Sequence, residues 1–219
     1  MKSIYSLLVV LLIVTIAFAD DSQYEDKPIT KVTYGSMVKL THIPSKFRLH
    51  SHKVNYGSGG GGSGQQSVTG FPETDDNNSY WVIKAPHDQV IPQGTIIKSG
   101  DVIRLQHLST KKNLHSHLAV SPITKQNEVS CFGEEGLGDT GDNWRVEFVK
   151  NHEGDSIWAR NDIIRLVHVD TKAFLHASPN AKYQNPIPGQ IEISATSKKS
   201  EDSTWMVEEG IYFEIRNDE

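Results

Sequence analysis

Histidine is the residue type in this 219-residue chain that could most readily support chemistry, because the chain contains ten of them. Two pairs lie two positions apart: His50 with His52, and His115 with His117. Alternate side chains of a strand point to one face, so each pair could present two imidazoles to a zinc ion. However, the third equivalent has His176 followed by Ser178, and no acidic residue or cysteine lies at a matching offset. We therefore expect structural histidines, no metal site and no other cofactor.

Other catalytic motifs are missing from the sequence. No G-x-S-x-G segment provides a serine nucleophile. The glycine-rich residues 57–64 match G-x-G-x-x-G, but no strand pattern precedes them, no helix pattern follows, and the Gly-Lys-Ser/Thr of a P-loop is absent. We predict that the chain is not an enzyme and has no catalytic residues.

The strongest signal is a threefold internal repeat. Each copy has a Leu-x-His segment, a second leucine seven residues after that histidine, and a closing tryptophan. The twelve anchors are Leu40, His42, Leu49 and Trp81, then Leu105, His107, Leu114 and Trp144, then Leu166, His168, Leu175 and Trp205. Tryptophans repeated in this way could form a sugar-stacking face, but they are more typical of a core. Such a repeat indicates one architecture built from three similar units.

Each copy also has the pattern of a half-buried strand. Val38, Leu40 and His42 alternate with Lys39 and Thr41, and the other two copies alternate in the same way. The histidines therefore lie on the apolar face, where we expect them to be buried and hydrogen-bonded to backbone.

Turn-forming residues precede these strands, namely Gly35, Gly100 and Asn161, which tolerate positive φ. Short strands with frequent turn residues predict an all-β fold with pseudo-threefold symmetry. No unit can bury its apolar face alone, so we expect one domain spanning about residues 29–213. Its repeats are predicted at residues 29–86, 94–150 and 151–211.

The N-terminal residues have the pattern of a secretory signal peptide. Lys2 is the only charge before Asp20, residues 7–14 are apolar, and an Ala-x-Ala exit ends at Ala19. We predict cleavage between Ala19 and Asp20, which removes residues 1–19 and leaves a flexible acidic lead-in at residues 20–28. An uncleaved anchor is the alternative, but the apolar run is shorter than the roughly 20 residues that span a bilayer.

Charge and cysteine content limit the partners and the sources of stability. Lysine and arginine total 22 against 27 acidic residues, and no basic run occurs, which argues against nucleic-acid or anionic-membrane partners. Cys131 is the only cysteine, so no internal disulfide can form, and we expect it to be a small buried residue. Asn77-Asn78-Ser79 is a sequon, which makes Asn77 a possible glycosylation site.

Several motifs resemble the MIR-repeat family, and within it the stromal cell-derived factor 2 proteins. They are Leu-His-Ser-His at 49–52 and 114–117, Tyr-Gly-Ser-Gly at 56–59, Gly-Gln-Gln-Ser-Val-Thr-Gly at 64–70, and Cys-Phe-Gly-Glu-Glu-Gly at 131–136. The resemblance covers about residues 30–213 and implies a β-trefoil of three MIR repeats. It also implies a subunit of an endoplasmic reticulum chaperone complex, with Hsp40 and Hsp70 partners and unfolded or O-mannosylated clients. MIR units also occur in protein O-mannosyltransferases and in calcium-release channels.

The chain departs from the family pattern in two places. Tyr34 and Ser99 stand where relatives often carry cysteines, and residues 215–219 are not a K/H-D-E-L signal. Residence in the endoplasmic reticulum lumen would then need a retained partner, and otherwise the protein would be secreted.

A secreted carbohydrate-binding trefoil is the alternative function. Many trefoil lectins carry glutamine two residues before the repeat tryptophan, where this chain has Ser79, Asp142 and Ser203. An O-mannosyltransferase would need a multi-span catalytic region, which this sequence lacks. The sequence does not indicate which loops bind a partner.

Overall fold

The computed structural model describes residues 31–57, 62–149 and 157–213. The predicted signal peptide, its cleavage site at Ala19 and Asp20, and the acidic lead-in at 20–28 lie outside the described residues. Among the described residues there is no helix long and apolar enough to cross a membrane.

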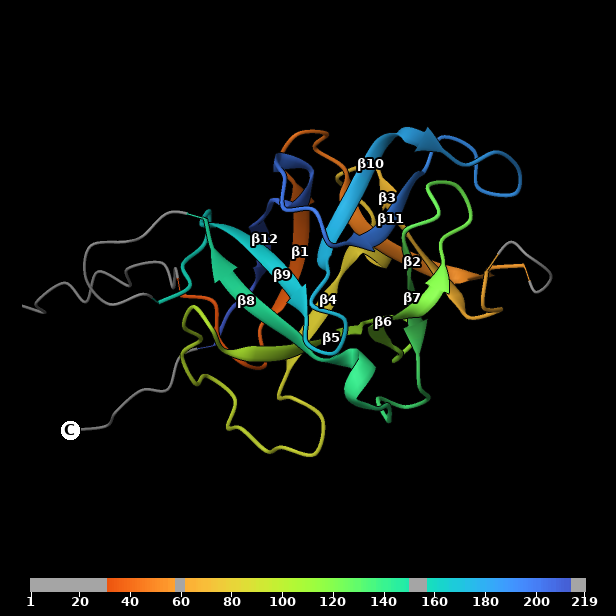
Figure 1. The fold of residues 1–219 in the computed structure, drawn as a ribbon. Coiled ribbons are helices and arrows are strands. Elements are labelled where there is room, and N and C mark those ends of the chain that lie inside the picture. The colour runs from red at the N-terminus through yellow and green to blue at the C-terminus, as the bar shows by residue number, and fades with distance from the viewer. Residues whose placement is uncertain (1–30, 58–61, 150–156, 214–219) are drawn as a thin grey trace, which may run out of the picture.

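Twelve strands and three single-turn 3₁₀ helices make up the described secondary structure (Figure 1). The first repeat contains β1 (Met37–His42), β2 (Arg48–Asn55), β3 (Gln66–Phe71), η1 (Asn77–Ser79) and β4 (Trp81–Lys84). The second contains β5 (Val102–His107), β6 (Asn113–Val120), β7 (Asn127–Phe132), η2 (Thr140–Asp142) and β8 (Trp144–Phe148). The third contains β9 (Ile163–His168), β10 (Phe174–Lys182), β11 (Ile191–Thr196), η3 (Glu201–Ser203) and β12 (Trp205–Ile211). The prediction of an all-β fold is confirmed.

The first and fourth strands of the repeats form a closed barrel. β1 pairs with β4, β4 with β5, β5 with β8, β8 with β9, β9 with β12, and β12 with β1. The remaining strands form three hairpins, and their inner strands β3, β7 and β11 pair with one another. Figure 1 shows these hairpins gathered at one end of the barrel. Six barrel strands closed at one end by three hairpins constitute a β-trefoil, which confirms the predicted fold.

The register demonstrates the threefold symmetry residue by residue. Val38 is opposite Trp81, Ile103 is opposite Trp144, and Ile164 is opposite Trp205. The first strands of the three repeats are therefore equivalent. The turn before each strand is equivalent as well, because Gly35, Gly100 and Asn161 all adopt positive φ, at 89°, 100° and 71°.

The barrel interior contains a single apolar core shared by all three repeats. All twelve anchor residues are at most 1% exposed. Each of the three repeat tryptophans donates its indole N–H to the carbonyl of the second anchor leucine in its own repeat, at 2.9–3.0 Å. Because these rings are fully buried, they do not form a sugar-stacking surface.

The end of the barrel opposite the hairpins is filled by one side chain from each repeat. Val32, Ile97 and Trp158 occupy equivalent positions and are fully buried. The Val32 N–H donates to the Trp158 carbonyl, and the Trp158 N–H donates to the Ile97 carbonyl, both at 2.8 Å. This contact ties the three repeats together below the barrel strands.

Candidate functional site

The histidines that end β1, β5 and β9 connect neighbouring repeats. His107 Nε2 lies 2.9 Å from the carbonyl oxygen of Asn78 in η1, and its Nδ1 lies 2.9 Å from Thr110 Oγ1. A carbonyl oxygen only accepts, so Nε2 must carry the proton. The ring also packs against Trp81, with the ring centroids 5.0 Å apart. A residue of the second repeat therefore holds the last turn of the first.

The same contact recurs around the threefold axis. His168 Nε2 lies 2.9 Å from the Gly141 carbonyl oxygen, and His42 Nε2 lies 3.1 Å from that of Asp202, which joins the first repeat to the third. Burial lowers the pKa of His42 and of His107 to about 4, and it also lowers the pKa of His168. These histidines are neutral at neutral pH and act as structural links.

The histidines at the start of each hairpin have acidic partners in two of the three repeats. His50 Nδ1 lies 2.7 Å from Asp76 Oδ2, and His115 Nδ1 lies 3.0 Å from Asp142 Oδ1 and 3.6 Å from Asp139 Oδ1. His176 Nδ1 is buried and has no hydrogen-bond partner among the described residues.

The spacing in the sequence did not indicate these acidic partners. The loops before η1 and η2 differ in length, so the offset from histidine to aspartate is not constant along the chain. The offset from the tryptophan is constant instead, since Asp76 and Asp139 each lie five positions before the repeat tryptophan. That spacing is a signal that could have identified them.

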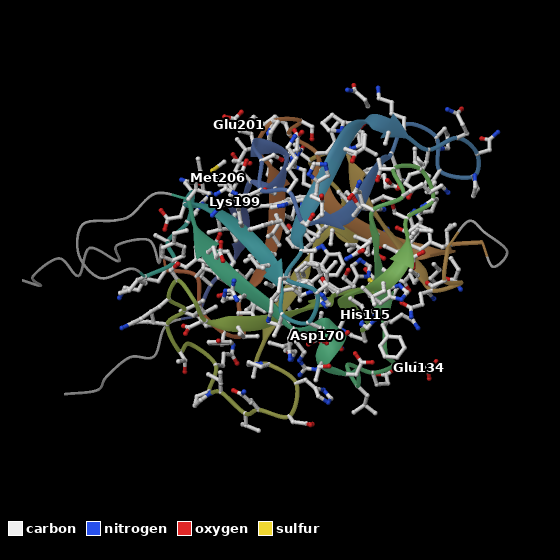
Figure 2. All side chains as sticks on the ribbon, in the orientation of Figure 1. His115, Glu134, Asp170, Lys199, Glu201 and Met206 are labelled. Carbon is white, nitrogen blue, oxygen red and sulfur yellow. The ribbon has the colours of Figure 1, made fainter. Side chains whose placement is uncertain are left out.

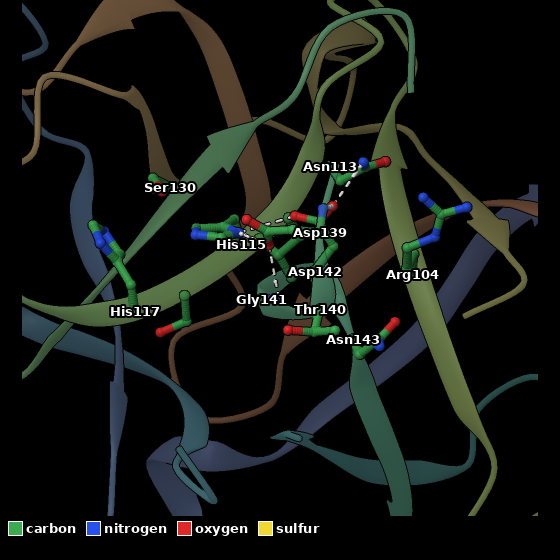
Figure 3. A network of polar contacts seen from close by, with 12 residues as sticks. Arg104, Asn113, His115, His117, Ser130, Asp139, Thr140, Gly141, Asp142 and Asn143 are labelled. Atoms are coloured by element: carbon green, nitrogen blue, oxygen red, sulfur yellow. Dashed lines mark hydrogen bonds and ion pairs between the residues drawn. The ribbon is translucent and has the colours of Figure 1, made fainter. Parts of the chain in front are cut away.

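The second repeat has the denser cluster (Figure 3). Asp142 is fully buried, and its Oδ2 accepts bonds from Asn113 Nδ2 at 3.0 Å and from the Asp139 N–H at 3.1 Å. Asp139 Oδ1 in turn accepts a bond from the Gly141 N–H at 2.8 Å. These bonds cap η2 and fix the position of His115.

One imidazole and two carboxylates could in principle hold a divalent ion. The candidate ligand atoms of His115, Asp139 and Asp142 lie within 4.8 Å of one another. However, Asp139 Oδ1 already accepts a bond from the Gly141 N–H, and His115 and Asp142 are bonded to each other. The arrangement is accounted for as a hydrogen-bonded helix cap.

Buried glutamates hold the tips of two hairpins. Glu128 is fully buried and accepts bonds from the Ser63 N–H, from Ser63 Oγ and from His117 Nε2, which lies 3.1 Å from Oε1. The equivalent Glu192 accepts bonds from the Ile123 and Thr124 N–H groups at 2.7 and 2.8 Å. Each glutamate therefore anchors the loop of the preceding hairpin.

An exposed hollow with polar side chains lies between the second and third repeats. It has a volume of about 450 Å³ and is lined by residues 115–118, 139–141, 168 and 170–171, and we call it the groove. Figure 2 labels His115 and Asp170, which face this hollow from β6 and from the turn after β9. Two exposed carboxylates, those of Asp139 and Asp170, lie on its rim, and its lining contains no lysine or arginine from the part of the chain that the structure describes.

A second hollow lies where two signature motifs meet. It measures about 390 Å³ and is lined by residues 55, 64–66, 112 and 131–134. The motifs meet because β3 pairs with β7, which places Gln66 opposite Cys131. The lining combines apolar groups such as Phe132 with polar ones, and the polar Gln66 is already bonded to Ser51 Oγ and Thr110 Oγ1.

The two remaining predicted residues have contrasting surroundings. Asn77 is exposed in η1, whereas Ser79 of the same sequon is fully buried and donates to Asp76 Oδ2 at 2.6 Å. Cys131 is 1% exposed, lies 3.3 Å from Ser51 Oγ, and has its pKa raised to about 12 by burial. Its thiol is therefore protonated at neutral pH and shielded from solvent.

Comparisons with known proteins agree with this architecture. The MIR domain family matches residues 60–207. A stromal cell-derived factor 2-like protein of Dictyostelium discoideum is 65% identical over 214 residues, which cover 98% of this chain and 99% of that protein. The crystal structure of the SDF2-like protein from Arabidopsis thaliana has a TM-score of 0.80 and 46% identity, over 85% of this chain and 99% of that one. A chain of the S. cerevisiae protein O-mannosyltransferase Pmt1-Pmt2 complex, bound to the sugar donor, has a TM-score of 0.75 and 29% identity. That match covers 87% of this chain and 27% of the transferase chain.

Proposed function

Because the chain belongs to the MIR-domain family, among the stromal cell-derived factor 2-like proteins, we propose that it is a non-enzymatic binding protein of the secretory pathway. In this role it is a subunit of an endoplasmic reticulum chaperone complex with Hsp40 and Hsp70, and it assists protein folding and quality control. The observation that carries the proposal is the 65% identity with a stromal cell-derived factor 2-like protein over nearly all of both chains. Identity at that level extends to exposed positions as well as to the core.

The chemistry of the buried polar groups supports a binding role over catalysis. The histidines of the barrel are neutral and bonded to carbonyl oxygens, and the carboxylates beside His50 and His115 accept bonds from neighbouring protein groups. A general acid or base must reach a substrate, and a nucleophile must be activated by an adjacent base. Among the described residues, the groups with suitable chemistry are occupied in holding the fold.

The similarity to a segment of an O-mannosyltransferase chain supports the choice of clients. That segment makes up about a quarter of its chain, at 27%. We therefore propose unfolded polypeptides, including O-mannosylated ones, as clients. We propose the lumen of the endoplasmic reticulum as the compartment in which it meets these clients.

Immunoprecipitation of the tagged full chain from endoplasmic reticulum lumen tests the proposal. We expect an Hsp40 and an Hsp70 to be recovered under crosslinking, together with newly synthesised secretory proteins. Recovery of neither chaperone would contradict the complex. Turnover of a sugar donor or peptide substrate by the purified chain would contradict the non-enzymatic role.

The alternative is a secreted carbohydrate-binding trefoil, and it has less support. The repeat tryptophans are fully buried, and the positions two residues before them hold Ser79, Asp142 and Ser203 instead of glutamine. A glycan array would decide: binding of a defined glycan class by the purified chain would favour the lectin function.

A further inference from the structure

The β6–β7 hairpin presents apolar side chains to solvent. Leu118 is 80% exposed and Val120 is 51% exposed, and both project from the same face of β6, two positions apart. Ile123, in the turn that follows, is 40% exposed. We call Leu118, Val120 and Ile123 the apolar strip. It begins at the groove, because Leu118 also lines that hollow.

The fold does not require these apolar residues. In the first repeat, β2 has the same His-Ser-His segment as β6 and, from its second residue onward, the same burial pattern. Yet Lys53 and Asn55 stand at the positions of Leu118 and Val120. Exposing two large apolar side chains on this hairpin does not stabilise the fold, because the equivalent hairpin of the first repeat forms with polar residues at the same positions. The apolar strip is therefore not explained by the stability of the fold. Exposed apolar patches of this kind commonly mark contact with another molecule.

The groove beside the strip is acidic, and among the described residues no lysine or arginine lines it. Asp139 has a side chain that is 55% exposed, and its ion-pair partner within the described ranges is His115 at 3.6 Å. Asp170 Oδ2 accepts a bond from Thr140 Oγ1 at 2.9 Å and is otherwise open. Lys172 follows closely in the chain, but its ammonium donates to the Val169 carbonyl.

Asp170 has no acidic equivalent in the second repeat. The turn after β5 has Ser109 where the turn after β9 has Asp170, each two positions past the barrel histidine. The equivalent positions of the first and second repeats therefore hold Lys53 and Ser109 where the groove has Leu118 and Asp170. The groove combines two exposed carboxylates with an apolar edge, and these equivalent positions do not.

We propose that the groove and the apolar strip bind an extended segment of an unfolded polypeptide in which a lysine or arginine is followed by apolar residues at alternate positions. The basic side chain enters the groove between Asp139 and Asp170, and the apolar side chains lie along Leu118 and Val120. Residues two apart in a strand are roughly 7 Å apart, so an extended partner repeats the spacing of the strip. A volume of about 450 Å³ accommodates one long basic side chain and adjoining backbone. This inference rests on the proposed function, since it identifies where clients bind.

The test uses the full chain and a fluorescein-labelled peptide containing one lysine followed by leucines at alternate positions, with serines between them. A second peptide carries glutamate in place of the lysine. The groove variant is L118K/V120N/D170S, in which each position takes the residue that another repeat carries there, so folding should be retained. The matched control is D75S/V90N, which removes an exposed acid and an exposed apolar residue far from the groove in sequence.

We expect fluorescence anisotropy to give a Kd at least tenfold weaker for the groove variant than for the wild type, and within twofold of wild type for the control. The glutamate peptide should bind the wild type at least tenfold more weakly than the lysine peptide. Circular dichroism spectra that match the wild type verify that the groove variant is folded.

A parallel measurement separates this inference from the proposed function. Capture of a reduced, denatured protein by the wild-type chain reports client binding without assuming a site. If the wild type captures the client and the groove variant captures it equally well, the groove assignment is overturned while client binding stands. If the wild type captures neither client nor peptide, client binding itself fails and the groove assignment fails with it.

Discussion

The imidazole Nε2 of His107 lies 2.9 Å from the backbone carbonyl oxygen of Asn78, so that the second repeat supplies the donor that completes the last turn of the first. The equivalent bonds from His168 to Gly141 and from His42 to Asp202 close the ring. Each repeat thus depends on its neighbour for one such hydrogen bond, so we expect the three repeats to unfold together.

Replacing His107 with alanine should destabilise the whole domain. The change leaves the Asn78 carbonyl without its donor and opens a cavity beside Trp81, so we expect a loss of about 2–4 kcal/mol in the free energy of unfolding. Urea denaturation followed by tryptophan fluorescence measures it. H107Q can still donate to the carbonyl and should recover part of the loss, whereas H87A, at a more exposed histidine, should change stability by less than about 0.5 kcal/mol.

Stability should fall as the pH drops from about 6.5 to 4. Unfolded histidine titrates near 6.5, whereas burial holds the pKa of His42 and His107 at about 4 in the folded chain. Between these values the unfolded state binds more protons, so the contribution is fully present above pH 6.5 and is lost on acidification. The loss is on the order of 3 kcal/mol for each of the two. Urea midpoints across this range measure it, and a shallower pH slope is expected for H107Q. A midpoint independent of pH would contradict the neutral, buried state.

Comparing substitutions of Trp144 and Trp158 measures how much an indole hydrogen bond contributes to stability beyond the packing of the ring. Trp144 Nε1 donates to the Leu114 carbonyl at 2.9 Å, whereas Trp158 Nε1 is buried with no hydrogen-bond partner among the described residues. Both rings are fully buried. W144F should therefore destabilise the protein by about 1 kcal/mol more than W158F. Equal losses in urea denaturation would show that the bond to Leu114 contributes little.

Replacing Glu192 with glutamine should loosen the tip of the neighbouring hairpin. The carboxylate accepts bonds from two backbone N–H groups and one hydroxyl, and an amide nitrogen in the same place cannot accept them. We expect hydrogen exchange at Ile123 and Thr124 to accelerate about ten- to a hundredfold, corresponding to roughly 1.4–2.8 kcal/mol. The exposed substitution E201Q is the control and should leave these amides unchanged.

Asn77 should carry a glycan when the chain is made in secreting eukaryotic cells. The asparagine is exposed, but Ser79 is buried and bonded to Asp76, so transfer must precede folding of the first repeat. A mobility shift that is reversed by endoglycosidase and abolished by N77Q would be the expected result. Identical mobility of N77Q and wild type would show that the sequon is unused.

The repeat anchors predicted the trefoil because leucine, histidine and tryptophan recur in one order and each has a single role in the fold. The alternation of Val38, Leu40 and His42 sufficed to place the first strand of each repeat on the core. Hydrogen bonds from these histidines to backbone were also predicted, but which carbonyl groups they bind could not be. Their carbonyl partners lie in the preceding repeat, and nothing in local spacing specifies a contact across that distance.

The groove was inaccessible to sequence reasoning for a related reason. Asp139 and Asp170 belong to different repeats and come together only when β8 and β9 pair. Leu118 and Val120 look unremarkable as strand residues, and their exposure becomes evident only when the structure shows which face of β6 is covered. Comparing equivalent positions of the three repeats would have indicated the difference at Lys53, although not its meaning.

The pairing of β1 with β12 brings the beginning and the end of the described chain to the same pole of the barrel, away from the hairpins (Figure 1). The hydroxyl of Thr33 even donates to the Phe213 carbonyl. A tag, a surface linkage or a fused domain attached at either terminus would therefore leave the β6–β7 hairpin facing solution. Joining residues 31 and 213 by a short linker should give a circular permutant that folds. Its new termini can be introduced in a loop between two repeats.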